Sequence, residues 1–293
     1  MTRPLGRLDP ARCSVQALAR GDSMVATASL AQRWVLIEQP GPWGRDALAQ
    51  SRLDAAVAPL LARRSRAENV RLLLIRRPDD RLTDSGRRWA YVDSRPGREG
   101  LWWSVRASDA DLLDAPWNGS VGEPATGPVY LVCTHGRHDA CCAERGRPVA
   151  AALTASHPAQ TWEVSHVGGD RFAANVLALP EGLYYGRMDP GTASQVAMLH
   201  EAGRVDIDRL RGRASYPMHV QYAEIALRRH LEEDRLDAVR LVRRQGSTSV
   251  FGCRDSNWAV TVRRETRGEG RLTCGVERLN PLPAHEVVSL RQI

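Results

Sequence analysis

The stretch VYLVCTHGRHDACC, residues 129–142, joins a short apolar run to a loop that holds three cysteines and two histidines. The apolar residues 129–132 predict a buried strand that ends at Cys133, because short apolar runs bounded by turn residues are typical of core strands. Residues 140–155 predict a helix after the loop. This order places Cys133 at the carboxyl end of a strand, where open α/β sheets bind ligands.

The pattern continues downstream with a strand at 161–164, two strands joined by a tight Pro-Glu-Gly turn within 172–187, and a helix at about 193–201. Strand, helix, strand, hairpin and helix in this order is typical of a thioredoxin-like domain. Upstream, the patterns predict a strand, a helix and three further strands, at residues 34–38, 46–63, 70–76, 87–93 and 101–106.

The fold class expected is α/β, with mixed sheets flanked by helices. The stretch NGSVGEPATGP, residues 118–128, is rich in Gly and Pro and predicts a domain boundary. We therefore expect an N-terminal α/β domain over 1–118, a thioredoxin-like domain with the cysteine loop over 119–205, and a C-terminal α+β section over 206–293 that packs on both. The similar order of elements in the first two domains is consistent with an old duplication, in which the N-terminal domain is also thioredoxin-like.

Composition narrows the classes of function. The chain has 293 residues and a formal net charge of +7, with basic residues that are all arginine and are interspersed rather than gathered in a stripe. Nucleic-acid binding is therefore disfavoured, whereas a redox partner protein with an acidic face fits the charge. The N-terminus lacks the apolar segment of a signal peptide, and no apolar run approaches the roughly 20 residues that cross a bilayer. We expect a soluble, cytoplasmic protein without a membrane partner.

The cysteine loop and the turn after the next strand offer a set of ligands. Cys133 and Cys142 supply two thiolates, and SHVGGD supplies His166 and Asp170 on either side of two glycines. Thiolate and imidazole favour zinc or an iron-sulfur cluster over magnesium or calcium. Zinc motifs usually place their first pair of ligands two to four residues apart, so the wider spacing here is better suited to a two-iron cluster.

The segments VCTHGRHDACCAERG and WEVSHVGGDRFAANVLALPEGLYYGR resemble the sucrase/ferredoxin-like family, which includes thioredoxin-like ferredoxins, and the likeness extends over most of the chain. The resemblance implies a 2Fe-2S cluster held by two cysteines, at positions matching Cys133 and Cys142, and by two histidines of an H-x-G-G-H motif. His166 matches the first of these histidines. It also implies electron transfer or redox sensing as the function.

The second histidine of that motif is Asp170 in this chain. Iron-sulfur clusters are held mostly by cysteine, with histidine as the known replacement. Three interpretations follow. Asp170 is the fourth ligand, or another residue takes that place, with Cys141, His135 and His138 as candidates, or the cluster has been lost and the domain is kept as a scaffold. A carboxylate ligand would give a lower reduction potential, with less pH dependence, than two histidines.

Other residues have weaker claims to function. Cys141 is more often a spare thiol, because helix neighbours point about 100 degrees apart and cannot both face one site. Arg171 and Asn175 are expected to support the ligands from behind. Cys13, Cys253 and Cys274 are expected to be packing residues, since free cysteine is among the most buried residue types.

Three functions compete on this reading. The first is an electron carrier or redox sensor with a 2Fe-2S cluster, and the second is metal-free thiol chemistry at Cys133, which the absence of C-x-x-C spacing weakens. The third is a scaffold or zinc module. Sucrose cleavage is disfavoured, because glycoside hydrolysis needs two carboxylates across a sugar site and only Asp139 and Asp170 lie near the loop. An electron carrier is thus favoured over a hydrolase, and an enzymatic activity is left open.

Overall fold

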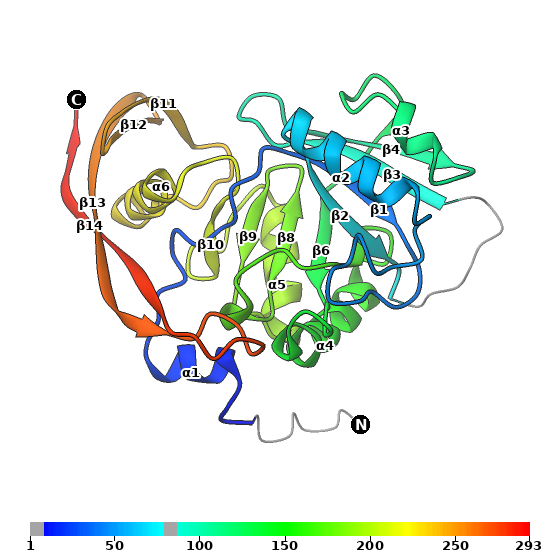
Figure 1. Cartoon of the computed structure of the whole chain (residues 1–293). Helices are drawn as coiled ribbons and strands as arrows, with labels where there is room; N and C mark the ends of the chain where they lie inside the picture. Colours follow the sequence, from blue (N-terminus) through cyan, green and yellow to red (C-terminus); the bar gives the residue numbers. More distant parts are fainter. Residues whose placement is uncertain (1–8, 79–86) are drawn as a thin grey trace.

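The strand that leads into the cysteine loop lies inside a ten-stranded mixed sheet (Figure 1). The computed structural model describes residues 9–78 and 87–293. Residues 1–8, which begin the N-terminal stretch without signal-peptide character, lie outside the described residues. The strands of the sheet, in chain order, are β1 (Arg33–Glu38), β2 (Arg71–Arg76), β3 (Arg87–Asp93), β4 (Gly100–Arg106), β5 (Glu123–Pro124), β6 (Val129–Cys133), β7 (Thr161–Val164), β8 (Val176–Leu179), β9 (Leu183–Tyr185) and β10 (Leu210–Arg213).

The sheet repeats one strand order in its two halves, running β10-β9-β8-β6-β7-β2-β1-β3-β4-β5. In the first half, β1 pairs parallel with β2 and antiparallel with β3, which pairs with β4. In the second half, β6 pairs parallel with β7 and antiparallel with β8, which pairs with β9. The halves meet where β2 and β7 pair antiparallel, at Ile75 with Val164 and Arg76 with Glu163.

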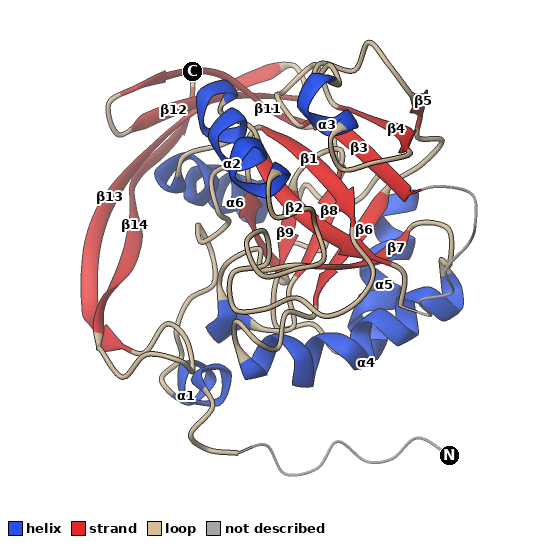
Figure 2. Cartoon of the chain, turned by 45° about the vertical axis from the view of Figure 1, so that its right-hand side comes forward, coloured by secondary structure: helices blue, strands red, loops and turns tan. Residues whose placement is uncertain are grey.

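Helices connect the parallel strands and cover one face of the sheet (Figure 2). Helix α4 begins after Asp139, whose carboxylate accepts a hydrogen bond from the backbone N–H of Cys141, and α5 begins at a capping box on Asp189. The helices are α1 (Cys13–Ala19), α2 (Val57–Glu68), α3 (Asp111–Asp114), α4 (Ala140–Ser156), α5 (Pro190–Glu201) and α6 (Met218–Leu231), and η1 (Asp170–Phe172) is a 3-10 helix.

The alternation of side chains along the strands divides the core between the two faces of the sheet. Trp34 and Leu36 of β1 and Leu131 of β6 belong to one buried cluster that extends over both halves. The opposite face carries two separate clusters, one against α2 and one against α4 and α5. Because the first cluster includes Cys133 and Cys142, the cysteine loop is anchored in the core that both halves share.

A second sheet of four antiparallel strands forms the C-terminal part of the chain. It packs against α6, and its core includes Val220 of α6 and Phe251. The connection between its last two strands, residues 271–279, extends back to α1 and to the start of α4, as Figure 1 shows. The strands are β11 (Val239–Gln245), β12 (Thr248–Cys253), β13 (Ser256–Gly270) and β14 (Asn280–Gln292).

Two elements differ from the sequence-based expectations. The helix expected at 46–63 is α2, which begins only at Val57, because the carbonyl of Asp54 accepts the first helical hydrogen bonds and residues 46–56 form turns. The connection expected at 204–217 contains β10. Its sequence, LRGR, looks polar, but the guanidinium of Arg211 is fully buried and hydrogen-bonded.

The mixed α/β class is confirmed, as a ten-stranded curled sheet with helices and a separate four-stranded sheet at the C-terminal end. The domain boundaries stay a prediction. Strands on both sides of residue 118 share the ten-stranded sheet, and β10, from the section after 205, belongs to it as well. Within 9–78 and 87–293, none of the helices combines the length and the apolar character needed to span a bilayer.

Candidate metal centre

The cysteine loop is held between the end of β6 and the first turn of α4. Gly146 of α4 lies against the carbonyl of Cys133, so closely that a Cβ at this position would be 2.1 Å from the oxygen. This close approach brings the first turn of the helix over the end of the strand. Cys142, on that first turn, thereby faces Cys133, and both side chains are buried.

The Gly-Gly turn after β7 places the second pair of predicted ligands. Gly168 and Gly169 have φ values of +99° and +83°, a left-handed conformation that glycine adopts without the Cβ penalty of other residues. The turn reverses the chain between His166 and Asp170. The Asp170 side chain consequently points back toward the histidine, with its Oδ1 atom 3.0 Å from Nδ1 of His166.

The structure brings the four predicted ligands together. Ligand atoms of Cys133, Cys142 and His166 lie within 4.8 Å of one another, and those of His138, His166 and Asp170 do so as well. The two groups share His166 and are also linked by Asp170 Oδ1, which lies 3.3 Å from the Sγ atom of Cys142. Two thiols therefore lie on one side of the site, with an imidazole and a carboxylate on the other.

A buried nitrogen without a hydrogen bond supports a metal at this site. The Nδ1 atom of His166 is buried and, despite its 3.0 Å distance from Asp170, is not aligned for a hydrogen bond with it. Buried polar atoms almost always have a well-aligned hydrogen bond, so this poorly aligned contact with Asp170 leaves the nitrogen available to bind an ion. A metal between His166, Asp170 and the two thiols would satisfy this nitrogen, and the donor set fits a 2Fe-2S cluster or another soft metal group.

The charges of the site are arranged to deprotonate one thiol. A hydrogen bond from Cys142 lowers the pKa of Cys133 well below its ordinary value, against the effect of burial, and His166 lowers it further. Burial acts to lower the pKa of His166, but Asp170 and Cys133 outweigh it and raise that pKa to about 9. Burial acts to raise the pKa of Asp170, and the neighbouring His166 brings it below the usual value. Without metal, His166 thus favours negative charge on Cys133 and Asp170, and both of these residues favour positive charge on His166.

The two histidines of the cysteine loop have different surroundings. His138 stacks on His166 with ring centroids 3.7 Å apart, and its Nε2 atom is 3.8 Å from Asp170. His135 instead uses both ring nitrogens inside the protein. Its Nε2 donates to the carbonyl of Gly44 at 2.6 Å, and its Nδ1 accepts the backbone N–H of His166 at 3.2 Å. His138 is thus placed as an alternate ligand, whereas His135 positions the backbone of His166.

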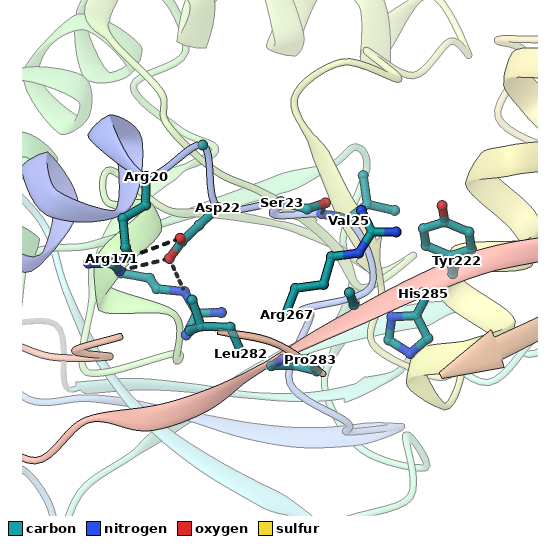
Figure 3. Close-up of a pocket in the computed structure, with 12 residues that line it drawn as sticks. Arg20, Asp22, Ser23, Val25, Arg171, Tyr222, Arg267, Leu282, Pro283 and His285 are labelled. Carbon is teal, nitrogen blue, oxygen red and sulfur yellow. Dashed lines mark hydrogen bonds and ion pairs between the residues drawn. The ribbon is translucent and has the colours of Figure 1, made fainter. Parts of the chain in front are cut away.

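Cys141 faces away from the site, toward Cys13 and Cys274, as its position next to Cys142 on a helix requires. Asn175 supports the Gly-Gly turn, because its amide donates to the carbonyl of Gly169 at 2.9 Å. The Arg171 side chain points away from the site. Its Nε atom lies 3.5 Å from the carboxylate of Asp22, in a pocket of about 310 Å³ between α1 and β14 (Figure 3).

Two arginines that hold the Gly-Gly turn were missed by the sequence analysis. Arg211 donates to the carbonyl of Gly168 at 2.9 Å and to the side chain of Asn175 at 2.7 Å, and Arg71 donates to the carbonyl of His166 at 3.1 Å. The Arg211 side chain is buried, which lowers its pKa to about 10. An arginine next to a glycine in a short run such as LRGR was the only sequence signal, and it does not distinguish a buried arginine from an exposed one.

The comparison with protein families agrees with this site. Residues 24–212 match the family model described as Sucrase/ferredoxin-like, and the match includes both the cysteine loop and the Gly-Gly turn. No curated protein and no solved structure matches the chain. Because the matched region is well over half of the 293 residues, the chain belongs to the Sucrase/ferredoxin-like family.

Proposed function

We propose that this protein is an electron carrier or redox sensor with a 2Fe-2S cluster held by Cys133, Cys142, His166 and Asp170. The observation that carries the proposal is the convergence of two thiols and an imidazole within 4.8 Å, with a carboxylate beside them. The order β6, α4, β7, β8, β9 and α5, with strands paired as 2-1-3-4, supports a thioredoxin-like fold for this half. The first half repeats the strand order, which supports the same fold there.

Asp170 is the fourth ligand in this proposal. Its side chain is only 6% exposed, and it contacts both His166 and the Sγ atom of Cys142. His138, the alternate, is 33% exposed and lies behind His166 rather than beside the thiols. A carboxylate can bind iron, and here the backbone turn at the two glycines already directs it toward the site.

The cluster would supply one-electron chemistry, and the protein ligands would set its reduction potential. Two thiolates and a carboxylate leave the site more negative than two thiolates and two imidazoles, which stabilises the oxidised state. We therefore assign a reduction potential below that of two-histidine centres, which span roughly −150 to +300 mV. His166 and His138 are partly exposed and form the side of the site that is nearest to solvent.

A protein partner with an acidic face is part of this proposal. Two adjoining clefts beside the cysteine loop, of about 440 and 470 Å³, share Trp43 and Arg137. The exposed side chains of Arg45 and Arg147 line the same clefts. This basic rim would attract an acidic protein, and the rate of electron transfer should then fall as salt is added.

One observation favours metal-free thiol chemistry as a second candidate. The thiol of Cys142 hydrogen-bonds to Cys133 and lowers its pKa, as in dithiol redox sites. A hydrolase is less well supported. Asp139, the other carboxylate near the loop, accepts hydrogen bonds from Cys141, Thr273 and Cys274 and faces away from Asp170.

Anaerobic purification, followed by an absorption spectrum and by iron and sulfide assays, tests the proposal. We expect visible bands and about two irons and two sulfides per chain, the stoichiometry of a 2Fe-2S cluster. Cys133→Ser and Cys142→Ser should lose them. Cys253→Ser is the matched control, because Cys253 is equally buried but lies in β12, far from the loop. Protein that stays free of iron after reconstitution would contradict the cluster and support the thiol chemistry.

A further inference from the structure

Three thiols from distant parts of the chain meet on the other side of α4 from the proposed cluster. Cys13 begins α1, Cys141 lies in the first turn of α4, and Cys274 lies in the connection between β13 and β14. Figure 1 shows α1 and the connection between β13 and β14 side by side below the ten-stranded sheet, near α4. The Sγ–Sγ distances are 3.6 Å between Cys13 and Cys141, 3.4 Å between Cys141 and Cys274, and 3.5 Å between Cys274 and Cys13.

A carboxylate completes the group. The Oδ2 and Oδ1 atoms of Asp139 lie 3.7 and 3.9 Å from the Sγ atom of Cys13, and one ligand atom from each of the four residues lies within 4.8 Å of the others. Asp139 Oδ2 accepts hydrogen bonds from Thr273 and from the backbone of Cys274. Its Oδ1 atom accepts the backbone N–H of Cys141 at 2.8 Å and the thiol of Cys13 at 3.9 Å, and a metal that binds the Cys13 thiolate would displace that thiol proton.

The sulfur triangle has the dimensions of a single tetrahedral ion. Zinc holds thiolate sulfurs at about 2.3 Å, so two sulfurs on one zinc are about 3.8 Å apart. The three distances here are a few tenths of an ångström shorter, and all three are far longer than the roughly 2.05 Å of a disulfide. Packing alone explains the triangle poorly, because Ala173 is the one further residue in this small buried cluster.

We propose that Cys13, Cys141, Cys274 and Asp139 bind one zinc ion in a structural site that is separate from the proposed cluster. Thiolate-rich tetrahedral sites select zinc, and a site with four protein ligands leaves no position for a substrate. This assignment differs from the sequence-based expectation for Cys13 and Cys274, which treated both as packing residues. It rests on geometry that does not depend on iron at Cys133.

The zinc ion would link α1 and the connection between β13 and β14 to the first turn of α4. Cys13 brings α1, and Cys274 brings the turn of the C-terminal sheet, to the helix turn that carries Cys141 and Cys142. Since neighbours on a helix point about 100 degrees apart, Cys141 faces the zinc site and Cys142 faces the other site. Zinc binding would thus fix the helix turn that presents Cys142.

Metal analysis of the full chain, expressed with zinc supplied, tests this proposal. We expect about one zinc per chain in the wild type and in Cys253→Ser, and less than a tenth of that in Cys13→Ser and Cys274→Ser. Cys133→Ser should keep its zinc, whether or not the wild type contains iron. Failure of the cluster proposal would appear as a lack of iron and sulfide, with the zinc pattern unchanged, so the two proposals fail separately.

Several results would overturn the zinc site. The first is wild-type protein that stays free of zinc after incubation with excess Zn²⁺ under reducing conditions. The second is zinc that is lost in Cys133→Ser but kept in Cys13→Ser. Iron in place of zinc at these thiols, or a disulfide between two of them in protein purified under reducing conditions, would also contradict the site. X-ray absorption at the zinc edge gives an independent measurement. Three sulfur ligands at about 2.3 Å and one oxygen are expected, whereas a shell of nitrogen and oxygen alone would contradict the site.

A milder variant covers the case in which the cysteine variants fail to fold. Asp139→Asn keeps an oxygen that can accept the backbone N–H of Cys141 but removes the charge that favours a cation. Its affinity for Co²⁺, followed by thiolate-to-metal absorption, should fall by about tenfold or more relative to the wild type. An unchanged affinity would show that Asp139 is not a ligand and would overturn the four-residue site.

Discussion

At the scale of single residues, Asp170 sets the charge of the proposed cluster site. Its carboxylate is buried, 3.0 Å from Nδ1 of His166 and 3.3 Å from the Sγ atom of Cys142. A negative ligand stabilises the more positive, oxidised iron. It also removes one imidazole nitrogen whose protonation would otherwise follow reduction.

We expect Asp170→His to raise the reduction potential and to make it depend more steeply on pH. The added imidazole is neutral when it binds metal, and its second nitrogen can take up a proton on reduction. Redox titrations of the cluster between pH 6 and 9 would measure both effects. Asp114→His, at an exposed position on α3, is the control and should change neither. An unchanged potential in Asp170→His would mean that Asp170 is not a ligand.

The Gly-Gly turn requires glycine at position 169 for two separate reasons. At Gly169 the backbone has φ +83°, and a Cβ would lie 2.2 Å from an Nη atom of Arg211. Gly203 has φ +69° but nothing within 4 Å of its would-be Cβ. Both alanine variants incur the left-handed penalty of roughly 1–2 kcal/mol, and only Gly169→Ala adds a clash. Urea unfolding should show a larger loss of stability in Gly169→Ala than in Gly203→Ala, and metal assays should show a loss of iron in Gly169→Ala. Equal stability losses in the two variants would contradict the close packing at Gly169.

At the scale of elements, the turn between β8 and β9 is joined to α5 by a side-chain hydrogen bond between Glu181 and His200. Glu181 accepts a hydrogen bond from Nε2 of His200 at 3.1 Å, and the two side chains are 20% and 3% exposed. Burial acts to raise the pKa of Glu181, but His200 outweighs it, so the pKa is below the usual value. A carboxyl group with a lowered pKa stabilises the fold above its unfolded-state pKa, and this contribution is lost as the pH falls through the folded-state pKa.

Glu181→Gln should therefore lower the free energy of unfolding by about 1 kcal/mol at pH 7. The difference between variant and wild type should shrink as the pH falls below about 4.5, the ordinary glutamate value. Urea titrations at pH 7, 5 and 3.5 would measure this trend. Glu269→Gln, at an exposed carboxylate on β13, should have little effect at any pH. A difference that stays constant down to pH 3.5 would contradict the role of the charge.

The elements themselves were predictable to different degrees. The strands β1, β3 and β6 were predicted within a residue because each is an apolar run ended by turn residues. The start of α2 was not, because residues 46–56 have helical spacing but form turns, and the first helical hydrogen bonds are accepted by the carbonyl of Asp54. In β10, the burial of Arg211 depends on hydrogen bonds to the distant Gly168 and Thr27, which a local pattern does not contain.

The candidate cluster site was predictable because its ligands lie close together in sequence. The neighbouring group of Cys13, Cys141, Cys274 and Asp139 was not. Cys133, Cys142, His166 and Asp170 come from two short motifs, and the structure brings them together. Cys13 and Cys274 are 261 residues apart, and neither is in a recognisable motif. Their meeting at Cys141 is a product of the whole fold, in which the C-terminal sheet extends back to α1.

At the scale of the whole molecule, the two halves of the large sheet share one core. Trp103 of β4 stacks on Trp162 of β7 with ring centroids 5.2 Å apart, and Arg76 of β2 pairs with Glu163 at 2.6 Å. Residues of both halves belong to the same buried cluster. We infer that neither half is stable alone, although the domains expected from the sequence divide the chain between them.

The fragment 119–205 tests this inference. It keeps β6 to α5 but loses β2, which covers the edge of β7, and β10, which carries Arg211. We expect it to lack a cooperative unfolding transition by circular dichroism, whereas the full chain should show a single transition by circular dichroism and by tryptophan fluorescence. A fragment that unfolds cooperatively would establish 119–205 as an independent domain.

The edge-to-edge pairing of β2 with β7 is the arrangement that two copies of a half-length chain would form across a two-fold axis. The loop after β1 occupies the place of the cysteine loop after β6, but it reads QPGPWG, residues 39–44, and offers no thiol or imidazole. In a true homodimer, every substitution appears in both copies at once. Two similar halves within one chain are free of that constraint, so one half can carry the proposed ligands while the other half serves only as a support.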